Sequence, residues 1–366
     1  VNKPHVGTDV LRTVVKNIRS EIESLGGEVR FESQVTGLIL CKQPEKAGIR
    51  EGTQAVKGVI VNDAEKIMSD HIVLAIGHSA RDTFEMLAKT PLTMQPKDFA
   101  VGYRVQHFQE QIDESQYGKQ DETCREALGA ASYKLTAQTK DGRGVYSFCM
   151  CPGGYVVNAS SEKGRLAVNG MSYHDRGSGV ANAAIIMTVT KEDFPDQSPL
   201  GGVAFQRELE ERAFQLADGK IPVQSLGDFK RHEERLTEHN AVLMKNRSDC
   251  GNIEQNVDVG DFPVRIKGQW AFANTRSILP EKLNEAFLEG MEQFGRKIKG
   301  FDADDTMIAG IESRTSSPVR IVRDEEGVSS LKGLYPCGEG AGYAGGITSA
   351  AMDGLLTAER IAVSMT

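Results

Sequence analysis

The chain has 366 residues, of which 39% are apolar and 38 are glycine, with a formal net charge of −8. This composition is that of a globular protein and excludes disordered, collagen-like and low-complexity classes. At about 150 residues per domain, the length predicts roughly two domains. The acidic balance argues against nucleic-acid binding. No apolar run approaches the roughly 20 residues that a membrane helix needs, so no membrane partner is expected.

The cysteines and the N-terminal residues indicate the cellular compartment of the protein. The six cysteines are scattered, and only Cys149 and Cys151 lie close together. The opening VNKPHVGTDVL contains no apolar core of a signal peptide. Both features predict free thiols in a reducing compartment, and hence a cytoplasmic protein.

The first hundred residues have the sequence pattern of an α/β fold. Apolar positions over residues 8–25 recur at helical spacing, and Gly26-Gly27 ends that pattern. A second helix is expected at 80–87, where Ser79 and Asp82 resemble a capping box. Three β-type segments lie between these helices, at 29–40, 56–62 and 66–76.

The middle of the chain differs from both ends. After Pro91 and Pro96, strand-like and loop-like pieces alternate to about residue 300. The expected strands are 101–108, 144–150 and 153–158, and the expected helices are 205–216 and 281–297. An α/β domain interrupted by an insertion is the simplest organisation.

The last 35 residues predict a strand at Gly333–Cys337, a glycine-rich turn and a helix at 347–363. Gly340 to Gly345 match G-x-G-x-x-G, in which backbone N–H groups can approach a phosphate at a helix N-terminus. A dinucleotide fingerprint also needs a βαβ unit with an acidic residue on its second strand. Only 21 residues follow Gly345, and they form one helix, so this fingerprint is excluded. A plain strand-to-helix turn remains the alternative.

Three stretches together resemble the uncharacterised FAD-dependent, or NAD(FAD)-utilising, dehydrogenases. They are LYPCGEGAGYAGGITSAAMDG (334–354), GIESRTSSPVRI (310–321) and CPGGYVVNASSEKGRLAVNGMSYHDR (151–176). The resemblance implies an α/β fold: an incomplete, Rossmann-like, three-layer FAD-binding domain at 1–95 plus 301–366. A β-rich α+β substrate or cap domain at 96–300 interrupts it.

Members of this family carry an N-terminal strand, a G-x-G-x-x-G turn, a helix and a strand that ends in Glu. None of these precedes Val1. The resemblance therefore implies that the chain corresponds to the C-terminal portion of the family, after its first βαβ unit. FAD is expected to bind this portion weakly or not at all.

The resemblance also assigns cofactor contacts. Glu339 takes ribose or ribityl hydroxyls, and the start of the last helix faces the pyrophosphate or the flavin. The backbone of Val35 contacts the adenine, and Ala75-Ile76-Gly77 stands where the family has Ala-Thr-Gly. The full set of implied cofactor residues is Val35, Ala75, Ile76, Gly77, Gly338, Glu339, Gly345, Gly346 and Ile347.

Three residues are candidates for catalysis. Arg314 could stabilise negative charge at the flavin edge, or it is a solvated surface arginine. In the C-x-C pair, one thiol is expected to face a cleft. Cys151, beside Pro and Gly, is the better candidate, and two buried thiols are the alternative. His174 is a candidate proton donor or substrate anchor, with a structural histidine as the alternative.

No metal is expected. Cys149 and Cys151 have no second Cys/His pair at a suitable spacing. His232, Glu233 and His239 do not match H-E-x-x-H and are expected on a charged, helical face.

The leading hypothesis is an FAD-dependent oxidoreductase. Hydride passes between FAD and an unidentified small organic substrate in a cleft between the domains, with NADH or NADPH as a candidate electron donor. The first alternative is a ligand-binding flavin-fold module without turnover. The second is an inert, cofactor-free fragment whose open sheet edge invites self-association.

Overall fold

The computed structural model describes residues 5–42, 54–232, 256–259 and 262–365. It is a mixed α/β protein with several sheets, and it divides into two compact units. Unit 1 comprises Val1–Gly27, Ala100–Thr188 and Arg207–Ser313, and unit 2 comprises Glu28–Phe99, Val189–Gln206 and Arg314–Thr366. Compared with the predicted division, residues 1–27 and 301–313 fall in unit 1, and residues 96–99 and 189–206 fall in unit 2.

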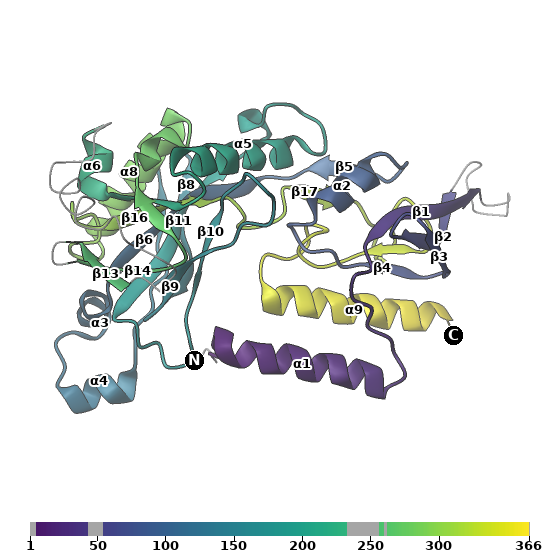
Figure 1. Ribbon diagram of the computed structural model, residues 1–366, viewed down its shortest axis with the longest axis horizontal. Helices are drawn as coiled ribbons and strands as arrows, with labels where there is room; N and C mark the ends of the chain where they lie inside the picture. Colours follow the sequence, from purple (N-terminus) through teal and green to yellow (C-terminus); the bar gives the residue numbers. More distant parts are fainter. Residues whose placement is uncertain (1–4, 43–53, 233–255, 260–261, 366) are drawn as a thin grey trace. The chain divides into compact units, whose positions relative to one another are not determined.

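Unit 2 contains three small sheets (Figure 1). An antiparallel meander is formed by β1 (Val35–Lys42), β2 (Gln54–Val61) and β3 (Glu65–Met68). The parallel pair consists of β4 (Ile72–Leu74) and β18 (Leu334–Pro336), and the antiparallel pair of β5 (Met94–Pro96) and β17 (Val319–Ile321). The helices are α2 (Arg81–Ala88) and α9 (Ile347–Met365), and the 3-10 turn is Lys191–Asp193.

One apolar core joins these pieces of unit 2. Phe84 and Leu87 of α2, Val319 and Ile321 of β17, and Leu334 of β18 are all buried in it. The core therefore holds the two short strand pairs together through side chains rather than through a continuous sheet.

Unit 1 is built on a seven-stranded sheet in the order β15-β12-β16-β6-β11-β8-β7. Its strands are β6 (Phe99–Phe108), β7 (Thr136–Gln138), β8 (Gly144–Cys151), β11 (Val180–Val189), β12 (Ile221–Ser225), β15 (Trp270–Phe272) and β16 (Met307–Glu312). A second sheet contains β9 (Tyr155–Asn158), β10 (Val168–Met171), β13 (Asn256–Val259) and β14 (Phe262–Lys267).

Helices complete unit 1. They are α1 (Thr8–Ser24), α3 (Gln109–Tyr117), α4 (Glu122–Leu128), α6 (Leu226–Lys230) and α8 (Glu281–Gly295), with a 3-10 turn at Thr275–Ser277. The boundary between residues 206 and 207 falls within α5 (Gly201–Leu216). Within the described ranges, no helix combines the length and apolarity that crossing a bilayer requires.

Three local predictions are wrong. The segment predicted at 29–40 becomes a strand only at Val35, because Glu32 has a left-handed backbone, with φ 52°. The segment predicted at 66–76 splits into β3 and β4, because the Ser69 hydroxyl bonds the backbone of His71 and breaks the strand. The capping box at Ser79 is absent, since Ala80 is the N-cap of α2 and has no capping side chain.

The other predicted helices and strands are present, with ends shifted by a few residues. Glu233 and His239 lie outside the described residues.

A buried ion pair ties the strands of unit 1 together. The Arg104 Nε of β6 donates to the Glu312 Oε2 of β16 at 2.8 Å, and the two side chains are 0% and 2% exposed. The same guanidinium donates to Asn182 of β11, Asn169 of β10 and the Cys149 carbonyl of β8, at 2.8–3.0 Å. Every polar contact of this cation is therefore made inside the protein, and both sheets of unit 1 contribute acceptors.

We expect Glu312→Ala to lower the free energy of unfolding of unit 1 by about 3–5 kcal/mol, because it leaves a buried guanidinium without its counter-charge. Urea unfolding followed by the fluorescence of Trp270, the only tryptophan of the chain and part of the same sheet, measures this. Glu208→Ala, which removes an exposed carboxylate, is the matched control and should cost less than about 1 kcal/mol. Equal losses in the two variants would contradict the account.

Candidate functional site

The parallel strands β4 and β18 end at the same edge in unit 2. Ile72 pairs with Leu334 and Leu74 with Pro336, and the Cys337 N–H continues the ladder to the Leu74 carbonyl at 3.1 Å. Ligands of open α/β sheets bind beyond the carboxyl ends of parallel strands. Here these ends lead directly into Ala75-Ile76-Gly77 and into Gly338-Glu339, so the structure brings these two predicted segments side by side.

The two loops are packed backbone to backbone. A side chain at Gly340 would collide with the backbone of Gly77, so the approach requires glycine. The Nδ1 of His78 lies 3.1 Å from the Oε1 of Glu339, and both side chains are about a quarter exposed. This pair links the loop after β4 to the loop after β18 at a surface that solvent reaches.

Arg314 and Ser317 support the same loops. The Arg314 Nη1 donates to the Ser79 Oγ at 3.4 Å, and Arg314 is only 8% exposed, so it is not a solvated surface arginine. The buried Ser317 hydroxyl bonds the carbonyls of Gly340 and Val319, each at 3.0 Å. The segment that carries the predicted catalytic arginine therefore lies against the glycine-rich turn.

An ion pair fixes this turn to the last helix. The Asp353 carboxylate of α9 accepts two hydrogen bonds from Arg323, at 2.6 and 3.0 Å, and one from the Gly338 N–H at 2.7 Å. Arg323 also donates to the Pro336 carbonyl at 2.8 Å and lies over the Tyr343 ring. Burial alone would raise the pKa of Asp353, but the hydrogen bonds from Arg323 and Gly338 outweigh it and lower that pKa.

The start of α9 is open. Nothing lies within 4 Å of the position that a side chain would take at Gly345 or Gly346, and Ile347 is 77% exposed. The first N–H groups of a helix have no partner within the helix, and its dipole favours negative charge there. An anionic group can therefore approach the backbone at this point without steric hindrance.

Val35 belongs to a different sheet of unit 2 from β4 and β18. It begins β1 and pairs with Val61 of β2 in the meander. Within the part of the chain that the structure describes, no hydrogen bond joins Val35 to the glycine-rich turn. Its predicted adenine contact stays a prediction.

His174 lies in unit 1 and is exposed. Its Nδ1 lies 3.1 Å from the Val6 carbonyl, its backbone N–H donates to the Asp9 carboxylate at 3.0 Å, and its ring stacks on His5. These contacts hold the segment that leads into α1. They are structural contacts, and the catalytic role of His174 stays a prediction.

Cys151 also lies in unit 1. Its Sγ is 3.9 Å from the Arg104 Nη1 and donates to the Cys149 carbonyl at 3.3 Å. Burial raises the pKa of the Cys151 thiol, although the Arg104 charge opposes this. A protonated thiol is a poor nucleophile. Cys149 is the more exposed member of the pair, and a catalytic role for Cys151 stays a prediction.

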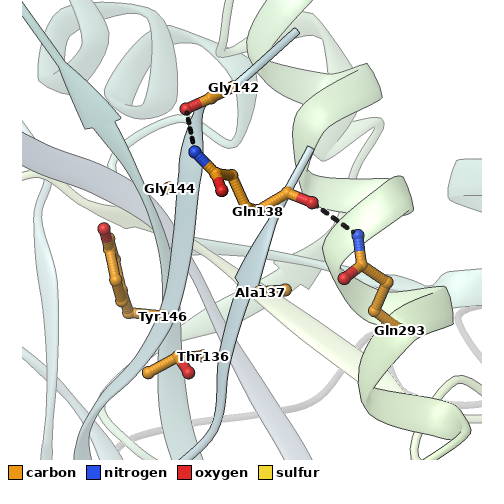
Figure 2. A pocket seen from close by; sticks show the side chains of 7 residues that line it. All are labelled: Thr136, Ala137, Gln138, Gly142, Gly144, Tyr146 and Gln293. Atoms are coloured by element: carbon orange, nitrogen blue, oxygen red, sulfur yellow. Dashed lines mark hydrogen bonds between the residues drawn. The ribbon is translucent and has the colours of Figure 1, made fainter. Parts of the chain in front are cut away.

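A separate pocket of about 510 Å³ lies in unit 1 beside the edge strand β7 (Figure 2). Gln293 of α8 donates to the Gln138 carbonyl at 2.9 Å, and Gln138 donates to the Gly142 carbonyl at 3.2 Å. Lys297 caps the Thr136 carbonyl in the same way at 2.6 Å. These contacts protect an edge strand from further pairing, and Tyr146 is the only titratable side chain of the lining.

Sequence reasoning missed Arg323, Asp353, His78 and Ser317. A signal existed for Asp353, which interrupts the apolar pattern of the last helix, and for His78, which directly follows Gly77. In the described residues, no three His, Cys, Asp or Glu side chains gather as metal ligands.

The fold and this site define a mixed α/β protein with a loop-built site at the end of a parallel strand pair. The family model described as "FAD-dependent protein, C-terminal domain-like" matches residues 98–315, more than half of the chain. The chain belongs to this family. It is also 45% identical over 364 residues to an "Uncharacterized protein" of Clostridium beijerinckii. The match covers 98% of this chain and 62% of that relative's length.

We expect Asp353→Asn to weaken the attachment of α9 at neutral pH by about 2 kcal/mol, because a charged acceptor of several hydrogen bonds is lost. Since folding lowers the pKa of Asp353, the pair stabilises the protein above the unfolded pKa of about 3.9 and is lost as the pH falls through the folded value. The difference between wild type and variant should therefore shrink as the pH falls from about 6 to 3.

Hydrogen-exchange protection factors of the α9 amides measure this difference. Glu359→Gln, on an exposed position of the same helix, is the matched control and should change little. A difference between wild type and Asp353→Asn that stays constant over this pH range would contradict the assignment.

Proposed function

We propose that this chain is the flavin-associating C-terminal portion of an FAD-dependent oxidoreductase. The observation that carries the proposal is the meeting of Ala75-Ile76-Gly77 with Gly338-Glu339 at the carboxyl ends of β4 and β18. Two segments separated by more than 250 residues, both assigned to FAD by the family resemblance, converge at one edge. The family match, over residues 98–315, supports an association with FAD-dependent proteins, and it covers neither of these two segments.

The residues present fit FAD. Gly77, Gly345 and Gly346 leave open space where other residues would place a side chain, so a cofactor can approach the backbone. Glu339 is partly exposed and can accept hydrogen bonds from ribityl or ribose hydroxyls. The start of α9 favours the negative charge of a phosphate or of a reduced flavin.

The chemistry divides between cofactor and protein. FAD supplies the capacity to accept and return a hydride. In this proposal Arg314, buried and aimed at Ser79, places a permanent positive charge beside the site and stabilises negative charge that develops there. The His78–Glu339 pair orients the acceptor carboxylate.

We further propose that unit 2 is part of a larger Rossmann-like domain. The β4–β18 pair has three residues in each strand, and a two-stranded sheet is marginal on its own. Of the residues of α9, only Thr357 is buried. Large apolar side chains of this helix are exposed, among them Met352, Leu355, Leu356 and Val363.

The completing strands would come from residues of a longer protein such as the Clostridium relative. Where they are absent, the open strand edges and the apolar face of α9 are surfaces for self-association.

We expect Gly345→Val to weaken FAD binding at least tenfold, or about 1.4 kcal/mol, by filling the open space at the start of α9. A titration of flavin fluorescence against wild type and variant measures this. Gly345 does not have a left-handed backbone, so the substitution does not strain the turn. Gly354→Ala, inside α9 and equally open, is the matched control and should bind FAD as wild type does.

The same titration with the longer Clostridium relative is the reference for tight binding. If the relative binds no flavin, the flavoprotein proposal is wrong. If it binds flavin that neither NADH, NADPH nor any organic donor reduces, a binding module without turnover replaces the oxidoreductase.

A further inference from the structure

Two cations converge on the glycine-rich turn from the β5–β17 pair. In that pair Arg320 lies opposite Gln95, and the Lys97 N–H donates to the Pro318 carbonyl at 2.8 Å. The Arg320 Nη2 donates to the Gly342 carbonyl at 3.0 Å. The Lys97 side chain also passes Gly342, with its Cδ 3.3 Å from where a Cβ of that glycine would lie.

In the described part of the chain, neither cation is held in an ion pair. Lys97 is half-buried, and its ammonium donates only to the Asp98 carbonyl, at 3.4 Å. Among the residues that the structure describes, no carboxylate forms an ion pair with Lys97 or Arg320. The contrast is Arg323, two residues further along, which is fully paired with Asp353.

Charges of both signs surround Lys97, and the carboxylates among them do not contact it in an ion pair. Burial, and then the nearby Arg320, lower the pKa of Lys97, while Asp98 and Glu339 oppose that shift. Glu339 is itself held by His78 at 3.1 Å. Two positive charges that lie close together and partly buried repel each other, which raises the free energy of the folded protein. An anion bound between them offsets this repulsion.

Arg320 is also held in place for binding. Its guanidinium lies over the Tyr343 ring, 4.7 Å from the ring centre, and the other ring contact of Tyr343 is with Arg323 at 3.7 Å. Stacking of this kind orients a planar guanidinium without using its outer N–H groups. One N–H on Nη2 donates to the Gly342 carbonyl, and the other outer N–H groups remain available to two oxygens of one ligand.

We propose that Lys97 and Arg320 form a binding site for an oxyanion, a phosphate or a carboxylate, beside the glycine-rich turn. The site is argued from these contacts alone. Only the identity of the molecule that carries the anion, either the phosphates of FAD or an acidic substrate, rests on the proposed function.

Calorimetric titration of the chain with inorganic phosphate and with succinate, at constant ionic strength, tests the site. We expect at least one of the two anions to bind wild type, and its affinity to fall tenfold or more in Lys97→Met and in Arg320→Gln. Lys89→Met removes an exposed lysine of the same unit and should leave the affinity unchanged. Methionine keeps most of the apolar stem of Lys97, so this variant should fold as wild type does, which circular dichroism verifies.

Two results would overturn the proposal: neither anion binds wild type, or Lys97→Met binds the anion as tightly as wild type. The anion that binds identifies the functional group of the ligand. Binding of phosphate alone indicates a phosphoryl group, and binding of succinate alone indicates a carboxylate.

Flavin titrations separate the two sources of the anion. If the site holds a phosphate of FAD, Lys97→Met weakens FAD and FMN but not riboflavin, which has no phosphate. If it holds an acidic substrate, all three flavins bind the variant unchanged. Phosphate binding that depends on Lys97 in a protein that binds no flavin would leave the anion site standing and remove the proposed function. If the protein binds flavin but anion binding does not depend on Lys97, the proposed function stands and the anion site is wrong.

Discussion

The placement of α9 against the glycine-rich turn depends on one carboxylate. Asp353 connects α9 to Arg323 and to the Gly338 N–H, and Arg323 in turn holds the end of β18 through the Pro336 carbonyl. Only Thr357 of α9 is buried, so apolar packing within the described residues does little to hold this helix. Because the ion pair reaches both sides of the glycine-rich turn, it sets where the turn begins and where its helix starts. A site built on this turn therefore requires the Arg323–Asp353 pair.

The glycines of the turn serve two different physical purposes. Gly340 and Gly342 permit close packing, because a side chain at either position would meet the backbone of Gly77 or of Val319. Gly345 and Gly346 meet nothing, so they leave space instead of filling it. The first pair makes the turn rigid and brings it against the loop after β4. The second pair keeps the helix N-terminus accessible to a ligand, which is what a cofactor-binding turn needs.

Most of the elements that local sequence patterns predicted are present, because helix and strand periodicity depends on neighbouring residues. The helices at 8–25, 80–87 and 347–363 illustrate this. The strand predicted at 66–76 failed where the Ser69 hydroxyl bonds the nearby backbone, which apolar periodicity does not report. The candidate site likewise has one part that local sequence indicates and one part that it does not. Glycine spacing indicated the turn, whereas Arg323–Asp353 and Lys97–Arg320 join residues far apart in the chain, and only the tertiary fold brings them together.

The central claim is that the loops after β4 and β18 contact FAD. Hydrogen exchange of the Clostridium beijerinckii relative, with and without FAD, tests it most directly, because that protein contains the matching segments within a longer chain. The account predicts slower exchange on FAD binding in the segments aligned with residues 75–79 and 338–347. Protection confined to other parts of the protein, with these two segments unchanged, would contradict it.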